Sequence, residues 1–178
     1  VLSLVNENTN DPTVVSLSLT SSAPTTFDWE VVLDRGTHPS DPAWGALDSS
    51  NTAIVLTTID SNSGNMWIWR IDGASGSLDW ERVAISGTDS DSDSPRLRLP
   101  GPVIVQLDND AAPEMILTIP TDSNGRTPGN GAKFVAMEMT SISEIFDFRT
   151  PNGYADTQPL PIDTDGDSIH DRLCWVTW

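Results

Sequence analysis

Short apolar runs, separated by polar segments that contain Gly and Pro, recur along the whole chain. Runs of roughly four to eight residues rich in Val, Ile, Thr and aromatic residues predict β-strands, and the polar segments between them predict turns. The run Met66–Ile71 is apolar at nearly every position, so we expect this strand to be covered on both faces. The glycine-containing segment from Asp72 to Gly76 predicts a hairpin turn directly after it. The predicted strands are Val1–Val5, Val14–Leu19, Phe27–Val32, Trp44–Leu47, Ala53–Ile59, Met66–Ile71, Ser77–Val83, Val103–Gln106, Met115–Ile119, Lys133–Met139, Glu144–Arg149, Leu160–Ile162 and Arg172–Trp178.

A weak internal repeat relates distant parts of this strand pattern. The matching segments are Phe27–Val32, Leu78–Val83 and, more loosely, Phe146–Thr150. Four-stranded units of about 40–60 residues with an aromatic landmark in each unit are typical of β-propeller blades. Because blades bury their faces against one another, we expect the landmark residues Trp29, Trp80 and Phe148 to pack between blades.

The sequence therefore predicts an all-β fold, a β-propeller segment of four-stranded antiparallel blades. We expect a partial blade over residues 1–40, full blades over 41–98 and 99–156, and the start of a further blade over 157–178. A closed propeller takes typically four to eight blades, so we expect an open segment of a longer propeller. The chain also begins and ends in apolar runs, which favours the same interpretation.

The segment Asp163–Asp171 is the strongest candidate site in the chain. Carboxylates occupy positions 1, 3, 5 and 9 of this loop, and Ile169 occupies position 7. Ca²⁺ takes six to eight oxygen ligands, and alternate Asp residues in a tight loop can turn several oxygens toward one centre. The apolar, β-branched run that follows predicts a strand, so the loop is interpreted as a calcium turn between two strands. The alternative is a solvated Asp-rich turn.

Composition and charge narrow the class of protein further. Of the 26 acidic residues 20 are Asp, a residue that favours turns over helix interiors, and the formal net charge is −17. This charge repels nucleic acid and anionic lipid, so both are excluded as partners, and we expect no membrane insertion by this segment. The single cysteine, Cys174, excludes an intrachain disulfide framework, and we expect it to be buried in its strand.

The repeat and the acidic loop together resemble the FG-GAP/VCBS repeat family, a blade type also found in integrin α-subunit propellers. The resemblance implies a calcium loop between the first and second strands of a blade. It assigns the metal ligands of the main loop as Asp163, Asp165, Asp167 and Asp171 through their side chains and Ile169 through its carbonyl. Ser168 stands where the family has Gly, and Gly166 lies nearby.

The preceding unit contains a second, weaker match to the same motif. Its four ligand positions are Gln106, Asp108, Asp110 and Glu114. Pro113 matches a proline of the family, but position 1 is a neutral amide and Ala111 replaces Gly. The corresponding segment around Asp48 is expected to hold no ion.

Catalytic groups are sparse by comparison. The segment Ile71–Trp80 partly resembles a repeat of quinoprotein propellers, which hold a quinone cofactor at their centre. His38 and His170 are the only histidines, and we expect His170 to point to solvent from its acidic loop. No nucleophile elbow or phosphate loop accompanies them.

We therefore expect a non-enzymatic, calcium-binding propeller segment of a secreted or cell-surface protein, used for adhesion or ligand binding. Its expected partners are a protein or glycan ligand and further propeller blades of the same chain. The alternative is the propeller part of an extracellular enzyme, either a quinoprotein dehydrogenase or a polysaccharide-acting enzyme. The Ser/Asp run between Gly87 and Pro95 is expected to be a flexible connection between blades.

Overall fold

The described part of the chain is built of β-strands, with no helix in it. The structure, a computed structural model, describes residues 2–5, 11–17, 27–36, 38–47, 51–59, 65–85, 99–119, 132–141, 143–150 and 157–176. Within these residues no helix of sufficient length and apolarity to cross a membrane is found. The predicted all-β class is confirmed for this part of the chain.

The observed strands follow the predicted ones closely. They are β1 (Leu2–Val5), β2 (Pro12–Leu17), β3 (Phe27–Val32), β4 (His38–Pro39), β5 (Ala43–Ala46), β6 (Thr52–Ile59), β7 (Met66–Asp72), β8 (Leu78–Ile85), β9 (Val103–Val105), β10 (Glu114–Ile119), β11 (Lys133–Glu138), β12 (Glu144–Arg149), β13 (Leu160–Ile162) and β14 (Arg172–Cys174). The sequence pattern missed β4, which has two residues and ends in a proline. The Ser/Asp run 88–94 and the residue Asp48 lie outside the described residues.

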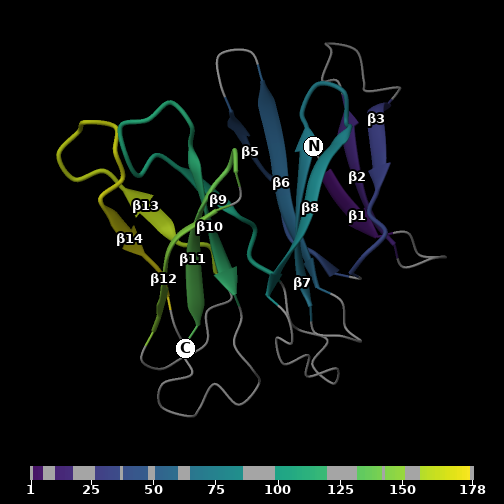
Figure 1. Cartoon of the computed structure of the whole chain (residues 1–178). Coiled ribbons are helices and arrows are strands. Elements are labelled where there is room, and N and C mark those ends of the chain that lie inside the picture. Colours follow the sequence, from purple (N-terminus) through teal and green to yellow (C-terminus); the bar gives the residue numbers. More distant parts are fainter. Residues whose placement is uncertain are drawn as a thin grey trace.

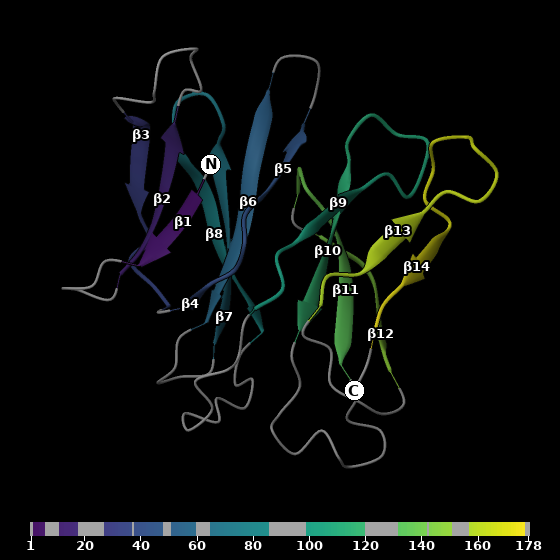
Figure 2. The same cartoon turned by 180° about the vertical axis from the view of Figure 1, so that it is seen from behind.

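The strands form four antiparallel sheets that follow one another along the chain (Figures 1 and 2). The first sheet has the order β1-β2-β3 and the third has the order β12-β11-β10-β9. In the second sheet β4 and β5 both pair with the same edge of β6, followed by β7 and β8. The fourth is the hairpin β13-β14. Apart from β4, which pairs with β6 beyond β5, strands that follow one another within a sheet are neighbours in it, as in a meander.

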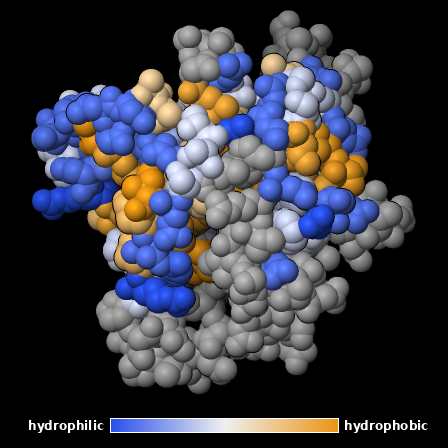
Figure 3. Space-filling view, viewed as in Figure 1, coloured by the Kyte–Doolittle hydropathy of each residue, from blue (hydrophilic) through white to orange (hydrophobic). Residues whose placement is uncertain are grey.

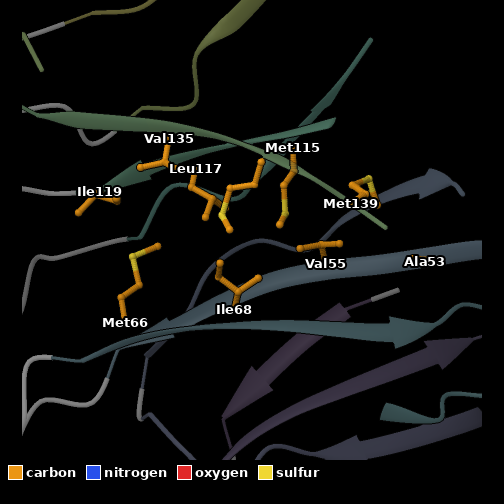
Figure 4. Close-up of a cluster of buried hydrophobic side chains, with 10 residues drawn as sticks. Ala53, Val55, Met66, Ile68, Met115, Leu117, Ile119, Val135 and Met139 are labelled. Carbon is orange, nitrogen blue, oxygen red and sulfur yellow. The ribbon is translucent and has the colours of Figure 1, made fainter. Parts of the chain in front are cut away.

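The second and third sheets pack face to face through aliphatic side chains. Strand β7 contributes Met66 and Ile68, and strand β10 contributes Met115 and Leu117, all essentially inaccessible to solvent. Figure 4 shows the β6 and β7 side chains pointing toward those of β10 and β11 across this interface. Alternate residues of these strands lie on opposite faces, because the side-chain period of a strand is two.

The opposite face of the second sheet is buried as well, against the first sheet. Trp69 and Ile71 of β7 are fully buried there together with Val14 of β2. Trp29 of β3 packs on this cluster, and its indole N–H donates to the Gly73 carbonyl at 3.3 Å. Strand β7 is thus covered on both faces, which confirms the expectation from its continuous apolar run.

The third sheet has a second apolar face of its own, on which the β13-β14 hairpin lies. Phe134 of β11 and Phe148 of β12 stack with ring centroids 4.9 Å apart. Trp175, which follows β14, lies 5.1 Å from each of these two rings, and Leu173 packs on the same cluster. Trp29 and Phe148 thus pack between sheets, whereas the expectation that they pack between propeller blades stays a prediction. The Trp80 side chain lies outside the described part.

The first strands of successive sheets approach one another closely. A Cβ added to Gly45 of β5 would lie 2.8 Å from the Ile104 side chain of β9. A Cβ on Gly101, just before β9, would lie 2.5 Å from the Asp41 carbonyl oxygen and 2.6 Å from the Gln158 amide nitrogen. The segments that enter β5, β9 and β13 therefore lie close together.

One expectation about the end of the chain is wrong. Cys174 was expected to be buried, but it is exposed. It lies at the end of the short strand β14, whose described pairing is with β13 alone. The apolar composition of its surroundings therefore did not translate into burial. Among the residues that Figure 3 colours by hydropathy, hydrophilic ones predominate, with smaller hydrophobic areas between them.

Candidate metal centre

Two acidic loops occupy the same place in two successive sheets. One joins β9 to β10 and the other joins β13 to β14, so each connects the first strand of its sheet to the second. Each brings together a group of carboxylates with oxygen atoms within 4.8 Å of one another, close enough to hold a metal ion. The groups are Asp108, Asp110 and Glu114 in the first loop, and Asp163, Asp165 and Asp167 in the second.

The second loop is organised by hydrogen bonds from its backbone to its own carboxylates. Asp163 accepts from the amide N–H groups of Gly166 at 2.6 Å and Ser168 at 2.9 Å. Asp167 accepts from the Ile169 N–H at 2.8 Å. The loop is therefore folded around its first carboxylate, in the manner of successive Asx turns.

These hydrogen bonds and the nearby charges shift the pKa values of two carboxyl groups of the loop in opposite directions. The amide N–H groups of Gly166 and Ser168 lower the pKa of Asp163. At Asp165 the amide N–H of Asp167 lowers the pKa, but the Asp167 charge, burial and the Asp163 charge raise it, and the net pKa is raised. Backbone N–H groups of the loop thus stabilise the charged form of Asp163, whereas neighbouring negative charges disfavour the charged form of Asp165.

Two further positions of this loop, Asp171 and Ser168, differ from the arrangement that the resemblance implies. Asp171 does not belong to the close group of three carboxylates, and it accepts hydrogen bonds from the Thr164 hydroxyl and amide N–H instead. Ser168 has a left-handed backbone with φ 75°, a conformation that costs about 1–2 kcal/mol for a residue with a side chain. The Gly expected at this position by the resemblance would adopt it freely.

The first loop is held by the amide of Gln106. Its NH₂ group donates to the Asp108 carbonyl at 2.9 Å and to the Asp110 carbonyl at 2.8 Å. The Asp108 carboxylate accepts from the Asp110 N–H, and the Asp110 carboxylate accepts from the Ala112 N–H, both at 2.8 Å. The predicted position 1 thus acts in this structure as a cross-link of the loop.

Glu114 closes this loop from the first residue of β10, and it is completely buried. Its Oε2 accepts from the Leu107 N–H at 2.6 Å, but its buried Oε1 has no hydrogen-bond partner. Burial is the largest cause that raises the pKa of Glu114, and the charges of Asp108, Glu138 and Asp110 raise it further. A buried carboxylate oxygen without a partner is costly, and two further acids nearby add negative charge. Hard cations take such oxygens as ligands.

The two loops contact each other through His170. Its backbone N–H donates to the Gln106 carbonyl at 2.7 Å, and its Nδ1 lies 3.4 Å from the Gln106 nitrogen, which can donate to it. The expectation that His170 points to solvent is therefore wrong. The β13-β14 hairpin docks on the third sheet, and this docking brings the imidazole onto the other loop.

Comparison of the chain with protein-family models, curated proteins and solved structures gave no match. Fold and site therefore rest on the residues themselves.

The sequence pattern missed one acidic neighbour of the first loop. Glu138 ends β11 directly opposite Glu114 in the β10-β11 register. Burial and the charges of Asp110 and Asp108 raise the pKa of Glu138. The pairing of β10 with β11 could have revealed Glu138. The sequence pattern does not show this pairing, because residues 120–131 separate the two strands.

A hollow of about 430 Å³ lies beside the second loop. Its apolar wall includes Phe146, Phe148 and Trp175, and its polar rim includes Asp171 and Arg172. Phe146 and Trp175 are about two-fifths exposed. The hollow is open to solvent, and both apolar and polar side chains line it.

Proposed function

We propose that the chain is a segment of a β-propeller that binds Ca²⁺ at its two acidic loops. The observation that carries this proposal is the repeated placement of the carboxylate groups. Both groups lie between the first and second strands of successive sheets, where the resemblance to FG-GAP/VCBS blades expects them. Scattered surface acids would form two such groups at the same position of successive sheets less often than they would form a single group.

The packing of the sheets supports the propeller arrangement. Sheets that bury both faces against neighbours, with their first strands converging, stack as blades do around an axis. In this proposal the axis passes beside the close approaches at Gly45 and Gly101. Further blades of the same chain are the proposed neighbours of the outer faces.

Calcium is the proposed cation because each close group consists of carboxylates alone. Hard cations with flexible coordination take such oxygen ligands, whereas zinc sites use His and Cys. Extracellular calcium modules bind at about 10⁻⁴–10⁻³ M, which suits a secreted or cell-surface protein. Adhesion or ligand binding is the proposed role, with a protein or glycan as the ligand. The hollow beside Trp175 offers an aromatic wall for such a contact.

Calorimetry and thermal melting test this proposal directly. The 178-residue chain is compared in chelator, in 10 mM Mg²⁺ and in 10 mM Ca²⁺, beside the double variant Asp110→Asn/Asp165→Asn. At a dissociation constant of about 10⁻⁴–10⁻³ M, each Ca²⁺ site adds roughly 1.4–2.7 kcal/mol of stability. That corresponds to a rise in melting temperature of roughly 3–10 °C for a chain of this size. Equal melting in Ca²⁺ and chelator, without binding heat, would refute calcium binding.

A further inference from the structure

Three carboxylates lie close together at one end of the third sheet, and a fourth, Glu138, lies on the neighbouring strand. Glu114 and Glu138 lie directly opposite each other on β10 and β11, and Asp108 and Asp110 lie on the adjoining loop. Like charges that face each other across a strand pair destabilise a sheet. Glu138 is not among the carboxylates whose oxygens lie within 4.8 Å of one another, so it acts on this group as a neighbouring charge.

The buried Oε1 of Glu114 shows where a counter-charge would act. Glu114 has no exposed surface, and this oxygen has no hydrogen-bond partner. Because a carboxylate oxygen of Glu114 lies within 4.8 Å of carboxylate oxygens of Asp108 and Asp110, a single cation can reach all three. Leaving such an oxygen without a partner is costly, and a hard cation removes the cost.

The geometry of this loop also depends on the next hairpin. Gln106 holds the carbonyls of Asp108 and Asp110 through its side-chain amide. The backbone of Gln106 is in turn held by His170, through the 2.7 Å bond from the His170 N–H and the contact with Nδ1. A residue of the β13-β14 loop therefore fixes the residue that shapes the β9-β10 loop.

We propose that the cation site at Gln106–Glu114 depends on three segments, with Glu138 as a neighbouring charge on β11 and His170 as a positioning residue from the next sheet. The inference rests on the proposed function, since it takes Ca²⁺ as the ligand. It goes beyond the loop motif, because neither residue belongs to the segment Gln106–Glu114. The site is then complete only when the β13-β14 hairpin is docked.

The test uses Ca²⁺ titrations by calorimetry on the full 178-residue chain. All variants are made in an Asp165→Asn/Asp167→Asn background, so that the remaining heat reports the Gln106–Glu114 loop. Glu138→Gln is compared with Glu144→Gln, which removes the same charge from an exposed position on β12. A negative charge beside the site attracts the cation without ligating it, so Glu138→Gln should weaken binding about tenfold, and Glu144→Gln should leave it within about twofold.

The His170 arm separates positioning from general stability. His170→Ala should weaken binding about fivefold, as expected for a modest coupling between sites. His170→Asn should restore affinity to within about twofold, because the Asn side-chain oxygen can accept from the Gln106 N–H. If His170→Ala does not fold, the His170→Asn and Glu138→Gln titrations carry the test.

The outcomes separate this inference from the proposed function. If Glu114→Gln abolishes binding while Glu138→Gln and His170→Ala behave like Glu144→Gln, the dependence on three segments is overturned and calcium binding stands. An equal loss in Glu138→Gln and Glu144→Gln also overturns it, because only bulk charge then matters. If the chain without these substitutions gives no heat with Ca²⁺, the proposed function itself falls.

Discussion

Replacing Glu114 by Gln should stabilise the calcium-free protein and remove its response to calcium at this loop. The substitution keeps the size of the side chain and an oxygen that can accept from the Leu107 N–H. It removes a buried negative charge, and its new NH₂ group can donate to the neighbouring carboxylates of Asp108 or Asp110. The first effect raises the stability of the calcium-free protein, and the second lowers the stability gained from calcium. A general loss of packing would lower the calcium-free stability, so it cannot explain both effects.

The expected magnitude comes from the unpartnered oxygen. A buried polar group without a partner costs about 1–3 kcal/mol, and more when it is charged, so relief of that cost in Glu114→Gln should be of this size. For a chain of this length, each kcal/mol raises the melting temperature by roughly 2–4 °C. The variant in chelator should therefore melt at least about 2 °C above the unmutated chain.

Thermal melting followed by circular dichroism at pH 7 measures both effects. The unmutated chain, Glu114→Gln and the exposed control Glu144→Gln are each melted in chelator and in 10 mM Ca²⁺. Only Glu114→Gln should start higher in chelator and gain less from Ca²⁺ than the other two. A variant that melts lower than the unmutated chain in chelator would show that Glu114 is not under strain, and the reasoning would be wrong.

Three further predictions concern pH, backbone strain and the convergence of the sheets. Because the pKa of Glu114 is raised above its usual value of 4.5, its charge costs stability at neutral pH, and calcium-free stability should rise as the pH falls from 7 toward 4.5. The lowered pKa of Asp163 acts oppositely, and its contribution should be lost below its usual value of 3.8, as urea unfolding across pH would show. Ser168→Gly should add about 0.5–1 kcal/mol in the same assay, because Gly adopts the left-handed backbone without the side-chain cost. Gly45→Ala should cost about 1–3 kcal/mol, since its Cβ would meet Ile104 at 2.8 Å; an unchanged melting temperature would contradict the close approach of β5 and β9.

The strands were predictable because their sequences carry local signals. Continuous apolar runs such as Met66–Ile71 belong to strands that are covered on both faces, and the Asp72–Gly76 turn ends one of them with Gly76 at φ 72°. Strand β4 was not predictable, because two residues carry no periodicity. The burial of Cys174 was predicted wrongly, since burial depends on neighbouring strands and not on the composition of its own run.

The sequence predicted which acidic residues form the candidate site, but not which of them are buried or what they contact. The resemblance to FG-GAP/VCBS blades placed Asp108, Asp110 and Glu114 in one loop, and the structure brings their oxygens together. The complete burial of Glu114 is not encoded in any local pattern. The contact between His170 and Gln106 joins residues 64 positions apart in the chain, and it arises from the docking of the β13-β14 hairpin on the third sheet.

A crystal structure of the chain grown with Ca²⁺, with anomalous differences measured, tests the central claim most directly. The account predicts one anomalous peak at each acidic loop, with carboxylate oxygens at about 2.3–2.6 Å from the ion. The peak at the first loop should be coordinated by the Glu114 Oε1, which has no hydrogen-bond partner in its absence. Ordered carboxylates in both loops without an anomalous peak at either, at millimolar calcium, would contradict the account.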